Sequence, residues 1–135
     1  MDTRPLESEE REALRRGLAY FRRQDYFSAH DDWEEVWRDL SGRRRLFWQA
    51  MIQLAVGTHH WQNDNMRGCR SVWQKALQKC DDLSQLYDDE VPDALIFLID
   101  LISECLIIVD HGGDPQPTLT DYAIRVMSEQ WFDLT

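Results

Sequence analysis

The stretch that decides the fold is YFSAHDDWEEVWRDL, residues 26–40. On a helical wheel with about 100° per residue, its charged side chains fall on one arc and its apolar side chains on the other. Two titratable residues break this division, because His30 and Glu34 lie among the apolar side chains, four positions apart and therefore on one face. The stretch predicts an amphipathic helix with a polar pair on the face that it buries.

The next helical segment has a matching irregularity. Residues 44–62 are apolar nearly all round, which predicts the central and most buried helix. Gln49 and Gln53 nevertheless lie four positions apart on one stripe, and His60 continues that stripe. His59 is predicted to point elsewhere, because neighbours on a helix diverge by about 100°.

These two segments are expected to be antiparallel neighbours, because only a short connection centred near Ser41 separates them. Pairing them about this turn places His30 opposite Gln53 and Glu34 opposite Gln49. The sequence therefore predicts one buried polar layer to which both helices contribute.

Three interpretations of this cluster stay open at this stage. Buried polar groups need hydrogen-bond partners, so the cluster is explained by a closed structural network. It is also consistent with a ligand or hydrolytic site in which Glu34 acts as a base and His30 orients it or transfers a proton. A metal site is the weakest of the three, since Gln is a poor ligand and no HExxH motif is present, and no metal is expected.

The ligand-binding candidates are the polar or aromatic residues near this layer. Asn65 belongs to the turn NDNMRG, where its first interpretation is a helix cap next to Gly68. The full set of ligand-binding candidates is Trp37, Gln49, Gln53, His60 and Asn65.

The remaining pattern predicts an all-α fold, a compact bundle of five to six helices with the second and third as a central antiparallel pair. Helical spacing indicates further helices over about 8–23, 66–86 and 92–110. The segment after Pro117 is predicted to be a short helix from Thr120 or an extended stretch. No internal repeat or linker is evident, so residues 1–135 are expected to form one domain.

Charge and composition limit the kinds of partner that the protein is expected to bind. The net charge of −10 argues against nucleic acid, which needs clustered Lys and Arg, and the basic cluster GRRRLFW is interpreted as solvated surface. The most apolar run, residues 94–109, contains Asp100 and Glu104, so it is predicted to be a core helix and not a membrane span. The charged N-terminus and the absence of CxxC spacing predict a cytoplasmic protein with free thiols.

The motifs of residues 26–37 and 47–68 together resemble a known family, the domain of unknown function 309, over about residues 18–80. Asp31 and Cys69 depart mildly from the family's pattern. The resemblance implies a small all-helical fold but no established activity. Its matching residues are His30, Glu34, Trp37, Gln49, Gln53, Ala55, His60 or His59, Asn65 and Gly68.

Two functions of different class therefore remain. One is a small-ligand or hydrolytic site, with an unknown ligand and no identified cofactor. The other is a non-catalytic helical interaction module, for example a homo-oligomer, in which the polar cluster is structural and an exposed apolar patch binds the partner. Whether the protein is an enzyme is left open by the sequence.

Overall fold

The computed structural model describes residues 8–128, and these contain six α-helices and no β-strand, which confirms the predicted all-α class. No helix within this range is long and apolar enough to cross a membrane. The helices are α1 (Ser8–Arg22), α2 (Tyr26–Trp37), α3 (Gly42–Gln62), α4 (Met66–Ser84), α5 (Asp93–Asp110) and α6 (Gln116–Ser128).

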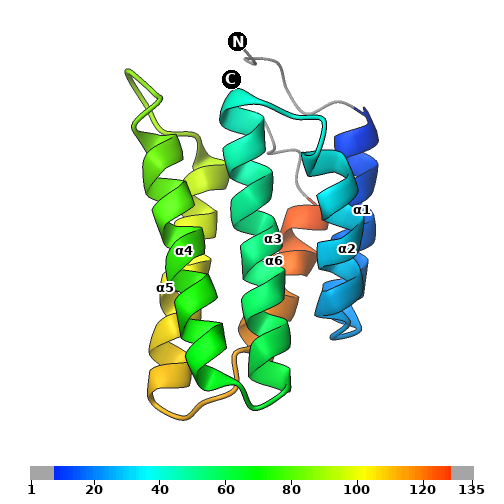
Figure 1. The fold of residues 1–135 in the computed structure, drawn as a ribbon, viewed down its shortest axis with the longest axis vertical. Helices are drawn as coiled ribbons and strands as arrows, with labels where there is room; N and C mark the ends of the chain where they lie inside the picture. Colours follow the sequence, from blue (N-terminus) through cyan, green and yellow to red (C-terminus); the bar gives the residue numbers. More distant parts are fainter. Residues whose placement is uncertain (1–7, 129–135) are drawn as a thin grey trace.

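The helices alternate in direction, and each packs on its neighbours in the chain (Figure 1). α3 stands between α2 and α4, while α1, α6 and α5 form the layer behind them. α6 also packs on α1, so the six helices close into a ring. This is the up-and-down topology that short connections favour.

The sixth helix begins earlier than the sequence suggested. It starts at Gln116 and not at Thr120, because the carboxylate of Asp114 accepts a hydrogen bond from the backbone N–H of Gln116 at 2.8 Å. Pro115 stands between these residues, where its fixed φ suits a helix start. The tail prediction is thereby resolved in favour of a helix as far as Ser128, and residues 129–135 lie outside the described range.

The α3–α4 hairpin repeats the α1–α2 hairpin at an offset of 40 residues, which corrects the expectation that the chain contains no internal repeat. In both turns, the N-cap side chain accepts a hydrogen bond from a backbone N–H of the following helix. The corresponding positions are the helix ends Arg22 and Gln62, the positive-φ residues Gln24 and Asp64, the N-caps Asp25 and Asn65, and the helix starts Tyr26 and Met66.

A tryptophan packed on a glycine holds each hairpin together. Trp33 lies against Gly17 and Trp73 against Gly57, so closely that a Cβ atom on either glycine would overlap the indole ring. The two indole N–H groups each donate to a backbone carbonyl of the facing helix, at 2.9 and 3.1 Å respectively. Both tryptophans are fully buried, so their N–H groups need these acceptors.

Candidate functional site

Contacts at both ends of the α2–α3 interface define its register. The Arg45 guanidinium stacks on the Trp37 ring at 3.9 Å from the centroid, near the connection between the helices. At the opposite end, the rings of Phe27 and His59 lie 5.3 Å apart. α2 and α3 therefore run antiparallel along this interface, as Figure 1 also shows.

The predicted polar residues lie between these two contacts. His30 and Glu34 occupy α2 between Phe27 and Trp37, and Gln49 and Gln53 occupy α3 between Arg45 and His59. We call these four residues together with Trp37 the polar seam. All five are partly buried.

His30 and Glu34 form a pair within α2. His30 Nε2 lies 3.6 Å from a Glu34 carboxylate oxygen, and His30 Nδ1 lies 2.9 Å from the carbonyl oxygen of Phe27. Because a carbonyl can only accept, Nδ1 carries a hydrogen and donates it. That bond fixes the tautomer and turns Nε2 toward the carboxylate, at a distance too long for a direct hydrogen bond.

The pair is half-buried, which corrects the prediction of a buried layer. The side chains of His30 and Glu34 are 17% and 38% exposed. The face of α2 that is fully buried carries Tyr26, Ala29 and Trp33, so the seam lies beside the core and not within it. The wheel placed the pair among aromatic residues, but two of those residues, Phe27 and Trp37, are themselves partly exposed.

Two buried polar atoms in the seam have no hydrogen-bond partner among the described residues. They are the side-chain oxygen of Gln53 and the indole nitrogen of Trp37. Such groups are uncommon in native proteins, because a buried donor or acceptor that stays unpaired costs about 1–3 kcal/mol. The seam is therefore not a closed hydrogen-bond network as far as residues 8–128 show.

The histidine of α3 that contacts α2 is His59, through the Phe27 ring. The sequence had predicted that His59 points away from this interface. His60 instead lies beside the α3–α4 turn, with its Nδ1 3.3 Å from the amide nitrogen of Asn65. The Asn65 side-chain oxygen accepts from the backbone N–H of Gly68 at 2.9 Å, which confirms the N-cap interpretation. The side chains of His60 and Asn65 are therefore engaged in forming this turn.

The three cysteines lack the features of nucleophiles or metal ligands. Cys69, Cys80 and Cys105 are free thiols and fully buried, and burial raises the pKa of each to about 12. At neutral pH they carry no significant thiolate fraction. Among residues 8–128, no three His, Cys, Asp or Glu side chains are grouped so that they could hold a metal ion.

We expect these thiols to be unreactive toward Ellman's reagent in the folded protein at about pH 8 and to react fully in denaturant. The raised pKa also implies that their contribution to stability is intact below the ordinary thiol pKa of 9.0 and is lost as the pH rises toward 12. Absorbance of the Ellman product measures the labelling, and urea denaturation at neutral and alkaline pH measures the change in stability. Rapid labelling of even one folded-state thiol would contradict the assignment.

A buried ion pair was missed by the sequence analysis. Arg44 is 1% exposed, and its Nε lies 3.6 Å from Oε2 of Glu10. The other carboxylate oxygen of Glu10, Oε1, accepts a hydrogen bond from the Trp48 indole N–H at 3.0 Å. The prediction that the basic cluster GRRRLFW is solvated is therefore wrong for Arg44. A charge at a buried position is possible because it is paired.

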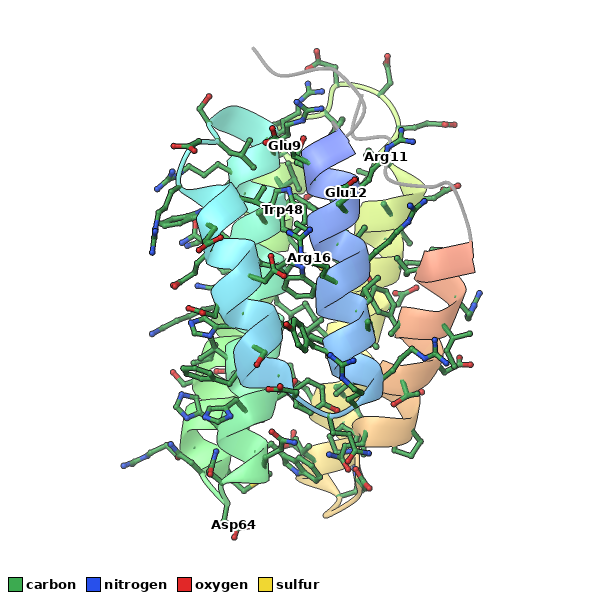
Figure 2. The ribbon with its side chains drawn as sticks, turned by 90° about the vertical axis from the view of Figure 1, so that its right-hand side faces the viewer. Glu9, Arg11, Glu12, Arg16, Trp48 and Asp64 are labelled. Carbon is green, nitrogen blue, oxygen red and sulfur yellow. The ribbon has the colours of Figure 1, made fainter. Side chains whose placement is uncertain are left out.

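Next to this ion pair is a cleft of about 510 Å³ between α1 and α2. Figure 2 shows Glu9, Glu12 and Arg16 along α1, with Trp48 between the two helices. The Arg16 guanidinium binds both carboxylate oxygens of Asp32, at 2.8 and 2.9 Å, and so ties α1 to α2. The cleft does not include the polar seam.

The part of the chain that contains the polar seam is similar in sequence to known proteins. The chain is 33% identical over 55 residues to the uncharacterized protein YpuF of Bacillus subtilis (strain 168), a match that covers 40% of this chain and 32% of that protein. The chain thus spans about a third of the length of this relative. No solved structure matches. Residues 14–72 match the sequence model of the Domain of unknown function (DUF309), which confirms the family resemblance for the segment that carries the polar seam.

Proposed function

We propose that the polar seam binds a small polar ligand without changing it covalently. The observation that carries this proposal is the buried side-chain oxygen of Gln53, which lacks a partner among residues 8–128. A ligand with an N–H or O–H group would satisfy this oxygen. His30 and Glu34 are partly exposed, so a ligand can approach these two residues from solvent.

The chemistry of the seam suggests what such a ligand contains. Glu34 offers carboxylate oxygens, and His30 Nε2 either accepts or donates a hydrogen bond depending on protonation. Together with Gln53 they favour a ligand group rich in donors, such as an amine, an amide or a polyol.

Binding is better supported than hydrolysis. Hydrolysis needs a donor that stabilises the developing oxyanion near the general base. The buried donor of the seam that lacks a partner among residues 8–128 is the indole N–H of Trp37, three residues from Glu34. Glu34 itself has no contact of hydrogen-bond length with its proposed orienting partner, because His30 Nε2 lies 3.6 Å from the carboxylate oxygen.

The competing hypothesis is an interaction module in which the cluster is a structural network. The unpaired atoms of Gln53 and Trp37 count against a closed network, because such networks are stable only when their members are satisfied. The two hypotheses differ in what they expect from removing the Gln53 amide.

We expect Gln53→Leu to leave the free energy of unfolding unchanged or to raise it by up to about 1 kcal/mol, because it removes an unsatisfied buried oxygen. A structural network predicts instead a loss of about 1–3 kcal/mol. Urea denaturation followed by tryptophan fluorescence measures the difference. The matched control is Gln74→Leu, an exposed glutamine on α4 that should change stability by less than about 0.5 kcal/mol.

Native mass spectrometry of the tag-free protein tests binding directly, beside the same variants and Glu34→Gln. A bound mass on the wild type and on Gln74→Leu, absent from Gln53→Leu and Glu34→Gln, supports the proposal. If the wild type carries no ligand, thermal shifts with simple amines, amides and polyols provide the second readout. Binding that survives both seam substitutions contradicts the proposal.

A further inference from the structure

α5 exposes an apolar and acidic stripe that the polar seam does not use. Ile96 and Ile107 are 46% and 60% exposed, and Asp100 and Glu104 lie between them on the solvent side. The spacing of four, four and three residues puts all four on one face of the helix. We call them the α5 stripe. Exposed isoleucines on one helical face are typical of a surface that contacts another molecule.

A groove runs beside the stripe, between α5 and α6, with a volume of about 230 Å³. Phe97, Leu101 and Val126 supply its apolar walls, and Asp100 and Glu104 belong to both the groove and the stripe. On the α6 side, Asp121 adds a third carboxylate.

Tyr122 forms part of the groove wall, while its hydroxyl is buried and not exposed in the groove. It is 6% exposed and lines the groove, and its hydroxyl has no hydrogen-bond partner among the described residues. Tyrosine hydroxyls usually find a partner when they are buried. α5 and α6 are also joined less extensively than the other neighbouring helices of the ring.

The charges of this surface select the kind of partner. Every charged residue of α5 is acidic, and of these Asp110 is paired with Arg70 at 2.6 Å. The groove contains one cation, Arg125, which lies over the Phe97 ring at 5.1 Å from the centroid. A second copy of this chain, with a net charge of −10, or an anionic membrane would bring like charges together. A cationic apolar partner is complementary.

We propose that the α5 stripe and the adjoining groove bind a basic amphipathic helix. Apolar side chains of the partner at positions i, i+3, i+4 and i+7 occupy the groove between α5 and α6 and cover Ile96 and Ile107. Lys or Arg residues on the edges of that apolar face lie against Asp100, Glu104 and Asp121. The surface is on different helices from the polar seam, so the proposal is independent of ligand binding there.

The test uses the full chain and a fluorescein-labelled helical peptide of about 18 residues with a leucine face flanked by lysines, long enough to span α5. Fluorescence anisotropy measures its affinity. We expect saturable binding that weakens as salt screens the lysine contacts. A peptide with the same leucine face and glutamate flanks, and a scrambled lysine peptide, should each bind at least about tenfold more weakly.

Variants on the protein side separate specific docking from general attraction. Ile96→Ser with Ile107→Ser, and Asp100→Asn with Glu104→Gln, should each weaken binding by about tenfold, the first by reduced apolar burial and the second by lost charge. Leu86→Ser removes an exposed leucine at the end of α4 and serves as the matched control. It should leave the affinity within about twofold.

Three results would overturn the proposal. The first is that the lysine peptide fails to bind, and the second is that its affinity is the same for the wild type and both double variants. Light scattering could also show a dimer that the Ile96→Ser, Ile107→Ser protein no longer forms, which would identify a second copy as the occupant. All four substituted residues of the double variants are on the surface, so these variants should fold. Circular dichroism of each variant checks this.

Discussion

Replacing Glu10 with alanine is expected to lower the free energy of unfolding by about 3–5 kcal/mol, the usual cost of breaking a buried ion pair from one side. The substitution leaves the buried guanidinium of Arg44 without its carboxylate partner. It also removes the acceptor of the Trp48 indole N–H. Both groups are buried in the folded protein, so losing the Glu10 carboxylate costs each of them a charged or hydrogen-bonding partner.

Chemical denaturation of the wild type and the variant measures this cost. The neighbouring Glu9 is exposed, and Glu9→Ala should change stability by no more than about 0.5 kcal/mol. Glu10→Gln keeps an oxygen that can accept from Trp48 but loses the charge, so its cost should fall between the two. Equal stabilities for Glu9→Ala and Glu10→Ala would refute the assigned role of the ion pair.

The second large effect concerns the glycines under the two packed tryptophans. Alanine in a helix interior is normally more stable than glycine by about 0.5–1 kcal/mol. At Gly57 we expect the opposite sign, a loss of about 1–3 kcal/mol, because the added methyl group would overlap the Trp73 indole. To accommodate it, the indole must move and strain its hydrogen bond to the Leu54 carbonyl oxygen.

A double-mutant cycle identifies the cause. If the cost comes from the indole, Gly57→Ala should be less damaging in a Trp73→Phe background, where the smaller ring leaves room for the methyl group. Ser71→Ala, at an exposed position on α4, is the control for helix propensity. Additive effects of the two substitutions would show that the glycine is required for a reason other than contact with Trp73.

Helical periodicity predicted the core helices well because it records which face is buried. α2 starts at Tyr26 as predicted but ends at Trp37, before Leu40, because the carbonyl oxygens of Trp37 and Leu40 bind the Arg45 side chain. That interaction depends on the following helix, so the local pattern does not contain it. The start of α6 could have been found from the Asp-Pro pair at 114–115, a known helix-start signal.

The two helices that carry the candidate residues were predicted correctly, but the burial of His30 and Glu34 was not. A helical wheel gives the direction of His30 and Glu34 relative to other residues of the same helix, and it does not say where the neighbouring helices end. Arg44 shows the opposite error, because it was expected to be exposed and is buried. Its position in a basic run suggested solvent, whereas the acidic partner that allows its burial lies 34 positions earlier, at Glu10.

The internal repeat escaped detection because the two hairpins share their geometry and few of their residues. Between residues 8–37 and 48–77, the identical pairs are Leu14 and Leu54, Gly17 and Gly57, and Trp33 and Trp73. Two of these pairs are the glycine and tryptophan contacts themselves. The physical requirement for a close helix approach was therefore retained, while the surfaces of the hairpins diverged.

The repeat and the ring together imply an order of assembly. Each glycine–tryptophan contact closes a loop of only sixteen residues, so the chain entropy lost in forming either hairpin is small. The contact between α6 and α1 joins segments about a hundred residues apart, and such distant pairings form slowly. We therefore expect the two hairpins to form early and the α1–α6 contact to form late, so that the α5–α6 surface is completed in the final stage of folding.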